Sequence, residues 1–256
     1  MTEREPLLAL SGVTLRAAGR TLVENLGLQI RAGERWAVLG PNGAGKSTLL
    51  AVLAGARMAD AGRVTAAGRP IEDQREDELA RLRALVTDRW VDPFKSTVLE
   101  TVMTARYVFG AGDGADETLA LGLLAALDCG DLARRDVRQL SRGERQRVAI
   151  ATALAQTTPA VLLDEPTAHQ DPRHQAWVIE YLLAQRERAL VSTLHDVNAA
   201  VRFATHALLL SGRGSYQLGP AAEVLQAEVL SDLFETSITA VEAEGERFFR
   251  VHPVRR

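Results

Sequence analysis

The sequence predicts an α/β fold with an antiparallel β region at its N-terminus and a helical region inserted into the core. An apolar segment at 35–39, a glycine-rich loop at 40–48 and a helix-forming segment follow one another directly, which is the strand–loop–helix order of α/β units. Apolar segments at 7–15 and 21–30 flank a short glycine-containing turn and favour a pair of strands. The composition is helical from 88 to about 156, which predicts the inserted region.

Length and composition indicate an ordinary globular protein. A chain of 256 residues, 46% hydrophobic and 25% charged, can bury one substantial core with an inserted subdomain. The single cysteine, Cys129, argues against a disulfide or a cysteine-based metal site, so a reducing compartment fits best. The 30 basic residues are spread among 33 acidic ones, which gives no reason to expect nucleic-acid binding. No apolar run reaches the roughly 18 residues of a membrane span, so we expect a cytoplasmic protein.

The glycine-rich loop fits the phosphate-binding pattern G-x-x-x-x-G-K-[ST] without a gap. Its glycines allow backbone N–H groups to converge on phosphate oxygens, Lys46 would reach the β- and γ-phosphates, and the Ser47 hydroxyl would bind Mg²⁺. A glycine-rich turn with an incidental lysine is the alternative, which the flanking strand and helix make weaker. We predict a nucleotide-triphosphate site in a phosphate-loop NTPase core, formed by Gly40, Pro41, Asn42, Gly43, Ala44, Gly45, Lys46, Ser47 and Thr48.

The segments after the loop helix continue the α/β pattern. Residues 62–64 and 68–71 predict a short hairpin, 76–83 a helix, and 84–87 a strand that ends at Asp88.

The inserted helical region has three predicted helices. Two lie at 98–109 and 117–127 and are joined by a glycine-rich link, and the third starts near Ser141. Ser141 and Glu144 have the spacing of a capping box before an apolar run. Taken alone, this segment predicts a well-capped helix and nothing more.

A hydrophobic strand at 161–165 ends in two adjacent carboxylates, Asp164 and Glu165. In phosphate-loop enzymes an acid at such a strand end holds Mg²⁺, usually through water, and we assign this role to Asp164. Glu165 then remains to orient or deprotonate the attacking water. Solvated turn residues are the alternative, which the apolar run and the upstream phosphate loop make weaker.

A helix at 173–187 and a strand at 189–193 come next, and His195 follows that strand. A histidine just past a strand end lies at the same sheet edge as the two acids, although a satisfied surface or core histidine is also compatible with the pattern. Asp196 would either orient His195 or cap a helix. The other histidines lack this placement and are interpreted as structural: His169, His174, His206 and His252.

The C-terminal part carries no recognisable chemistry. We predict strands at 207–210 and 215–218, short helices at 221–225 and 228–234, and a last strand at 248–251. This part is expected to serve packing or regulation.

Five features occur in a fixed order: the phosphate loop, a Leu-Ser-x-Gly segment at 140–144, the strand ending in two acids, Asp171, and His195. Together they resemble the nucleotide-binding subunit of an ATP-binding-cassette (ABC) transporter over roughly residues 7–220. The resemblance implies an ATP-binding core with the N-terminal β subdomain, a helical subdomain, and a small C-terminal extension. The corresponding ranges are 1–87 with 157–218, 88–156, and 219–256.

The same resemblance implies a head-to-tail homodimer that closes two ATP molecules, with Mg²⁺, between the phosphate loop of one copy and the signature segment of the other. A helix N-terminus with a capping serine and a glycine is a suitable second anion receptor. Glu165 would be the general base or water-positioning residue, His195 would contact the γ-phosphate, and Asp171 would link the two active sites. The implied signature residues are Ser141, Arg142, Gly143 and Glu144, and the implied metal-site residues are Ser47, Asp164 and Asp88.

The chain departs from the family pattern at three points. The signature usually reads Leu-Ser-Gly-Gly-Gln, and here Arg142 and Glu144 replace its third and fifth residues. Asp88 stands where the family commonly has glutamine. No aromatic residue lies near Ala17, where a ring often stacks on adenine, and Arg16 is the candidate to take its place.

The segments at 84–89, 140–147 and 203–210 most resemble ATPases of bacterial importers for iron-siderophore complexes, haem and cobalamin. That likeness implies membrane permease subunits, a periplasmic substrate-binding protein, and a peripheral location at the cytoplasmic face of the inner membrane. An exporter ATPase is an alternative that only the sub-family likeness disfavours. A non-transport clamp on nucleic acid or a ribosome is another, but such proteins usually carry long coiled coils or two cassettes in one chain.

Overall fold

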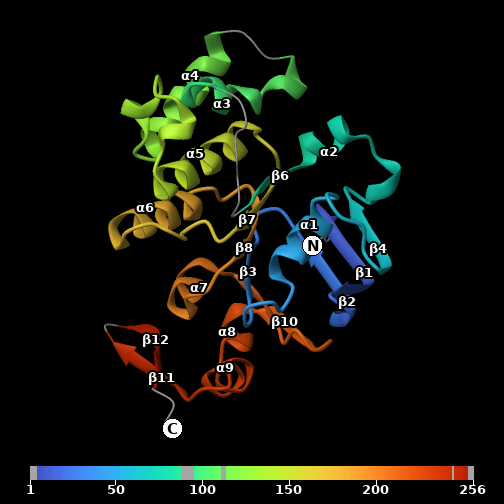
Figure 1. Cartoon of the computed structure of the whole chain (residues 1–256). Helices are drawn as coiled ribbons and strands as arrows, with labels where there is room; N and C mark the ends of the chain where they lie inside the picture. The colour runs from blue at the N-terminus through green and yellow to red at the C-terminus, as the bar shows by residue number, and fades with distance from the viewer. Residues whose placement is uncertain (1–4, 88–94, 111–113, 244, 253–256) are drawn as a thin grey trace.

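A six-stranded sheet forms the centre of the structure, a computed structural model that describes residues 5–87, 95–110, 114–243 and 245–252 (Figure 1). The strand order is β10-β9-β3-β8-β7-β6, with β10 antiparallel to β9 and the other pairs parallel. Strands β7 and β8 are fully buried, as expected where helices cover both faces of a parallel sheet. This sheet confirms the predicted α/β fold. Its strands are β3 (Arg35–Leu39), β6 (Arg83–Val86), β7 (Ala160–Asp164), β8 (Ala189–Thr193), β9 (His206–Leu210) and β10 (Tyr216–Pro220).

The N-terminal region is a second, antiparallel sheet with the order β2-β1-β4-β5. It shares one hydrophobic core with helix α1 and one face of the central sheet. The predicted N-terminal strand pair and the short hairpin after the loop helix are both confirmed. The elements of this region are β1 (Leu8–Ala17), β2 (Arg20–Ile30), α1 (Lys46–Leu53), β4 (Ala61–Ala66), β5 (Arg69–Pro70) and α2 (Glu76–Leu82).

The helical region and the C-terminal elements lie at opposite ends of the molecule (Figure 1). Both contribute to a second core against the other face of the central sheet. Within the described residues, every helix is too short or too polar to cross a lipid bilayer. The helices are α3 (Val98–Thr104), α4 (Gly114–Ala126), α5 (Arg142–Ala155), α6 (Pro172–Leu183), α7 (Val197–Phe203), α8 (Ala221–Val224) and α9 (Ala227–Phe234).

Two predicted helices are shorter than expected. The helix predicted at 98–109 ends at Thr104, where backbone bonds tighten to three-residue spacing, and a separate 3-10 turn follows at Tyr107–Phe109. The helix predicted to reach residue 187 ends at Leu183, and short-range backbone bonds again close the last turn. Tightened last turns of this kind satisfy carbonyl groups that the α-helix leaves free.

The C-terminal end holds a two-stranded hairpin of β11 (Ile238–Ala243) and β12 (Glu246–Val251). The sequence predicted only its second strand. All of β11 except Ile238 is exposed, so this strand lacks the alternation of buried and polar residues that would have indicated it. Helix α7, between β8 and β9, was also not predicted.

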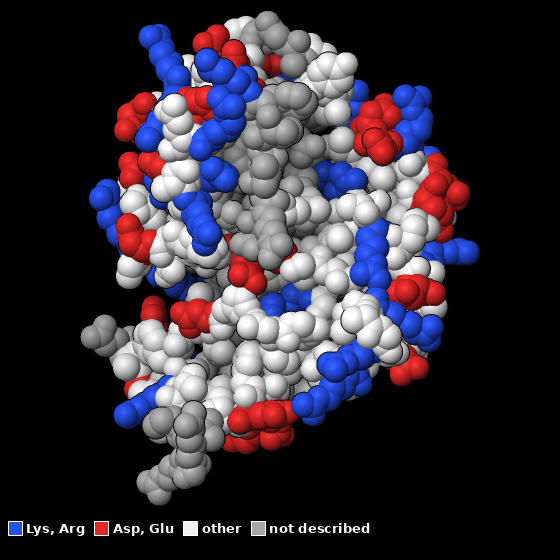
Figure 2. All heavy atoms as spheres, in the orientation of Figure 1, with Lys and Arg blue, Asp and Glu red and all other residues white. Residues whose placement is uncertain are grey.

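Charged side chains of both signs are interspersed on the face of the molecule shown in Figure 2. The surface shown therefore has local basic and acidic groups, without one continuous basic area.

Candidate functional site

The candidate site lies where three neighbouring parallel strands end. Strand β3 is next to β8, and β8 is next to β7. The register pairs Thr193 of β8 with Val38 on one side and Asp164 on the other. The phosphate loop, the acidic pair and His195 therefore leave the sheet at one edge, where α/β proteins bind ligands.

The phosphate loop requires glycine at two positions for different reasons. A Cβ on Gly40 would lie 2.3 Å from the carbonyl oxygen of Leu210, so only glycine fits beside β9. Gly45 caps α1 with a φ of 100°, a conformation that favours glycine. These conformations turn the backbone into the kind of N–H-lined concavity that binds phosphate groups.

Lys46 is buried inside the loop, with 6% of its surface exposed. Its Nζ donates to the carbonyl oxygens of Gly40 at 2.8 Å and Pro41 at 3.2 Å. Burial lowers the pKa of Lys46, while the carboxylates of Glu165 and Asp164 act in the opposite direction. The cation is therefore fixed at the loop and close to both acids.

Thr193 fixes the two acids at the end of β7. Its Oγ1 donates to Asp164 Oδ1 at 2.7 Å and accepts from the backbone N–H of Glu165 at 2.8 Å. Sequence analysis missed this residue, although a threonine at the end of the adjacent strand was a usable signal once the strand order was known. One hydroxyl thereby orients the Asp164 carboxylate and the main chain of Glu165.

The oxygen donors at this edge fit a magnesium ion. Asp164 offers a carboxylate that is 7% exposed, and Ser47 is exposed in the first turn of α1. Among the described residues, no three His, Cys, Asp or Glu side chains gather into a metal cluster. A carboxylate, a hydroxyl, waters and substrate phosphates are the donor set that Mg²⁺ commonly uses. Asp88, also predicted at the metal, lies outside the described residues.

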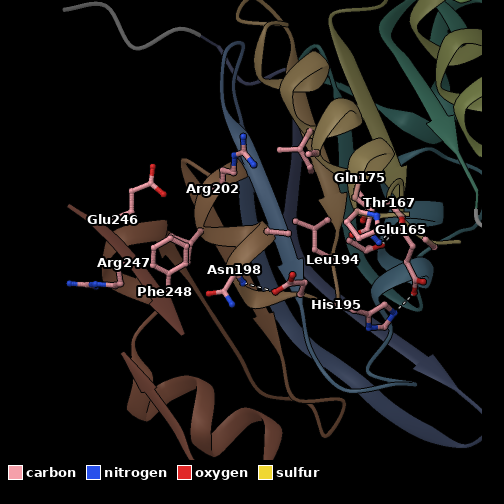
Figure 3. A pocket seen from close by; sticks show the side chains of 18 residues that line it. Glu165, Thr167, Gln175, Leu194, His195, Asn198, Arg202, Glu246, Arg247 and Phe248 are labelled. Carbon is pink, nitrogen blue, oxygen red and sulfur yellow. Dashed lines mark hydrogen bonds and ion pairs between the residues drawn. The ribbon is translucent and has the colours of Figure 1, made fainter. Parts of the chain in front are cut away.

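Glu165 and His195 face one another at the open side of the edge (Figure 3). His195 Nε2 lies 2.5 Å from Glu165 Oε1, and both side chains reach solvent. Glu165 has a φ of 50°, an unfavourable conformation for a residue with a Cβ. The amide of Gln146 in α5 donates to the Glu165 carbonyl at 3.4 Å.

Asp196 caps helix α7, which was one of its two predicted roles. Its Oδ1 accepts from the backbone N–H of Asn198 at 2.8 Å. The imidazole of His195 instead pairs with Glu165. The cap therefore fixes the start of the helix that follows the histidine.

The signature segment forms the predicted capping box at the start of α5. The backbone N–H of Ser141 donates to Glu144 Oε2 at 2.7 Å, and Ser141 Oγ accepts from the backbone N–H of Glu144 at 3.3 Å. Hydrogen bonds to the Glu144 carboxylate from the side chain and then the backbone of Ser141 lower the pKa of Glu144, with a smaller effect from Arg135 and Arg147. Ser141 and Arg142 remain exposed at the helix N-terminus.

Gly143 has a structural role that sequence analysis did not foresee. A Cβ there would lie 3.0 Å from the carbonyl oxygen of His169, in the segment that follows β7. Because Gly143 has no side chain, helix α5 can lie close to the backbone of His169.

Asp171 is exposed and caps α6. It accepts from the backbone N–H of His174 at 2.9 Å and contacts His174 Nδ1 at 2.8 Å, and these bonds lower the pKa of Asp171. The other ring nitrogen of His174 lies 3.1 Å from Asp128 Oδ2. In the described part of the chain, no hydrogen bond joins Asp171 or Ser141 to the phosphate loop.

Comparison with known proteins decides the family. The family model of ABC transporters matches residues 23–168, which is more than half of the chain. The chain belongs to the ABC transporter family. It is 40% identical to the hemin import ATP-binding protein HmuV of Streptomyces coelicolor over 240 residues, 91% of this chain and 85% of that protein. It is 37% identical to HmuV of Pseudomonas entomophila, over 89% of this chain and 92% of the relative.

Solved structures agree with this assignment. An inward-facing metal-chelate type ABC transporter superposes with a TM-score of 0.82 at 27% identity, covering 98% of this chain and 99% of that one. A dimeric, post-hydrolysis ATP-binding cassette with ADP and Pi gives 0.74 at 28% identity, covering 83% and 98%. The predicted fold and ATPase activity are thus confirmed: the chain is an ABC ATPase that binds ATP.

Proposed function

We propose that this ABC ATPase hydrolyses ATP to power import of a haem-type metal chelate through a separate membrane permease. The observation that carries the proposal is the pairing of Glu165 with His195 beside the phosphate loop. It supplies a carboxylate and an imidazole where the γ-phosphate of a loop-bound nucleotide would lie.

Binding of ATP is assigned to the phosphate loop. The backbone N–H groups of residues 40–48 would surround the phosphates, and Lys46 would exchange its bonds to Gly40 and Pro41 for phosphate oxygens. Ser47 and Asp164 would hold Mg²⁺, which when bound neutralises charge on the β- and γ-phosphates. The hydrogen bond from Thr193 Oγ1 fixes the Asp164 carboxylate.

Hydrolysis is assigned to Glu165 and His195. Glu165 would orient a water and accept its proton as the water oxygen bonds to the γ-phosphorus and the bond to the ADP oxygen breaks. His195 would donate a hydrogen bond to the γ-phosphate and hold the Glu165 carboxylate in place. The hydrogen bond from the Glu165 backbone N–H to Thr193 Oγ1 fixes the main chain of Glu165.

The complete site requires a second copy of the chain. Helix α5 begins after the exposed cap residue Ser141, and the N-terminus of a helix can bind an anion. We infer a head-to-tail homodimer in which the signature residues of each copy close over the ATP of the other, with Asp171 at the contact between the two sites.

A groove between β6, α3 and α5 is the proposed seat of the membrane permease. It has a volume of about 280 Å³ and mixes apolar and hydroxyl side chains, suited to a short cytoplasmic segment of a membrane subunit. Asp88, which follows Thr87 of this groove in the sequence, is proposed as a further residue at the metal. The chain would then lie peripherally at the cytoplasmic face of the inner membrane. The lining is Leu85, Val86, Thr87, Thr104, Ala105, Ala149, Thr152, Ala153 and Gln156.

The cargo proposal rests on the relatives, because the proposed ATP site makes no contact with cargo. The HmuV proteins are named for hemin import, and the similar solved structure is of a metal-chelate type transporter. A periplasmic protein would deliver the chelate to the permease. Ferric siderophores and cobalamin are the related cargoes to compare.

Uptake into vesicles tests this proposal. The chain is co-purified with its permease and assayed for ATP-driven uptake of hemin, cobalamin and a ferric siderophore. We expect hemin uptake, and we expect Lys46→Ala to abolish nucleotide binding and uptake because it removes the loop cation. Lys95→Ala, which removes an exposed lysine outside the loop, is the control for nucleotide binding. ATP hydrolysis without uptake of any chelate would contradict the cargo assignment.

A further inference from the structure

Asn198 joins the C-terminal hairpin to helix α7 through two hydrogen bonds. Its Nδ2 donates to the carbonyl oxygen of Phe249 at 3.1 Å, and its Oδ1 accepts from the backbone N–H of Phe249 at 2.7 Å. Phe249 pairs with Ala240 of β11 on its other side. The side-chain amide thus occupies the outer edge of β12, where a third strand would bond.

The same residue belongs to the first turn after the catalytic histidine. The backbone N–H of Asn198 donates to Asp196 Oδ1 at 2.8 Å, and His195 directly precedes Asp196. Asn198 therefore has its main chain fixed by the helix cap and its side chain fixed by the hairpin. A displacement of the hairpin would therefore move the first turn of α7, whose cap residue Asp196 directly follows His195.

The hairpin is itself anchored at both strands. Phe249 is 5% exposed and belongs to the core. At the start of β11, the backbone N–H of Ile238 donates to Ser231 Oγ of α9 at 2.9 Å, and that hydroxyl donates to the Ala227 carbonyl of its own helix at 2.6 Å. The hairpin is therefore held at α9 and at α7, whereas most of its other side chains are exposed.

An open pocket lies between the acidic pair, α7 and the hairpin. It has a volume of about 960 Å³ and extends from Glu165 and His195 to Phe248 of the hairpin (Figure 3). Several residues of α7, including Ala199 and Arg202, line it. Helix α7 packs into the core through Val197, Ala200 and Phe203, and Asn198 adds two hydrogen bonds to the hairpin at its first turn.

We propose that Asn198 is a positioning residue through which the C-terminal hairpin holds His195 against Glu165 and so sets the rate of ATP hydrolysis. The inference rests on the proposed catalytic roles of Glu165 and His195. It gives a function to the β11–β12 hairpin, which lies beyond the 23–168 segment that the family model matches.

A double-mutant cycle on the full-length chain tests the inference. Asn198→Ala is measured alone and together with His195→Ala, with kcat and KM for ATP, equilibrium ATP affinity and thermal melting recorded for each. Coupled contacting residues show non-additive effects, so we expect Asn198→Ala to lower kcat about three- to tenfold in the wild-type background and less than about twofold in the His195→Ala background. ATP affinity and KM should stay within about twofold.

Two further variants sharpen the result. Asn198→Asp keeps the acceptor for the Phe249 N–H and loses the donor, so kcat should fall between wild type and Asn198→Ala; this variant replaces Asn198→Ala in the cycle if the latter does not fold. Arg247→Ala is the matched control, because Arg247 lines the same cavity but pairs with Glu242 of its own hairpin. Its kcat should be unchanged.

The outcomes separate the inference from the proposed function. Equal fractional losses of kcat in both backgrounds, or a fall in melting temperature with unchanged kcat, would show that Asn198 only stabilises the fold and would overturn the inference. Absence of ATP turnover in the wild-type chain would instead overturn the proposed function, and the inference with it.

Discussion

The backbone conformation, the main-chain N–H and the carboxylate of Glu165 are each fixed by the structure around it. Its backbone has a positive φ, its N–H is bonded to Thr193, and its carboxylate contacts His195. A residue of this kind held in a left-handed conformation costs free energy, and such conformations gather at functional sites where the surroundings enforce them. The strain here coincides with the predicted catalytic position, which supports its assignment as the water-activating residue.

Replacement of Glu165 tests that assignment. Glu165→Gln keeps the shape of the side chain but removes the proton acceptor, so we expect the rate of ATP hydrolysis to fall by about 10²- to 10⁴-fold. The affinity for ATP should be retained, because Lys46 and the loop are untouched. Steady-state phosphate release and nucleotide-binding measurements check both expectations. Glu187→Gln, at an exposed position after α6, is the control, and undiminished turnover in Glu165→Gln would refute the assignment.

The individual contacts of the site were harder to predict from the sequence than its residue types. The spacing of the loop and the strand ending in Asp164 and Glu165 indicated the site, because both patterns reflect chemistry within one segment. Thr193 and Gln146 were missed because their roles arise only when separate segments meet, through strand register for one and helix packing for the other. Single-sequence patterns do not contain that information.

At the scale of elements, helix α5 shows how a local sequence motif fixes the start of a helix. Its capping box satisfies backbone groups at the N-terminus through Ser141 and Glu144. Hydrogen bonds from the Ser141 side chain and backbone lower the pKa of Glu144 below its ordinary value of 4.5. The ionised carboxylate therefore stabilises the folded chain above that pH, and this stabilisation is lost as the pH falls through the lowered pKa of the folded state.

This linkage predicts a pH-dependent stability difference. At pH 7, Glu144→Ala should lower the free energy of unfolding by about 1 kcal/mol, the scale of a helix-capping interaction. Its deficit relative to wild type should shrink below pH 4.5, the ordinary pKa of this carboxyl. Glu144→Gln preserves the box geometry without the charge, so its smaller deficit should vary little with pH. Urea unfolding between pH 3 and pH 7, followed by circular dichroism, provides the comparison; a deficit for Glu144→Ala that grows toward low pH would contradict the account.

Elements with a clear apolar period were predicted well, and exposed ones were not. The buried strands β3, β7 and β8 appear where their apolar runs indicated, because each is covered on both faces. Strand β11 is exposed along nearly its whole length and gave no such pattern. The helix predicted at 98–109 was too long because composition does not reveal where the backbone tightens after Thr104.

At the scale of the whole molecule, we propose that each chain carries two separate halves of a nucleotide site. The phosphate loop and the acids lie at the edge of the central sheet, while Ser141 starts the helix of another region. The segment after β7 contacts that helix at Gly143 and leads to Asp171, which caps α6. Closure by a second copy would join the halves and make hydrolysis depend on dimerisation.

ATP-dependent dimerisation of Glu165→Gln tests this central claim most directly. We expect light scattering to give twice the monomer mass with ATP and the monomer mass without it, because the variant binds ATP but does not hydrolyse it. Adding Ser141→Asp keeps a good helix cap but places a carboxylate against the phosphates of the other copy, so this double variant should bind ATP and stay monomeric. Thr97→Asp, at the equivalent cap of α3, should dimerise normally. Equal dimerisation of the Ser141→Asp variant, or a monomer at saturating ATP in Glu165→Gln itself, would contradict the account.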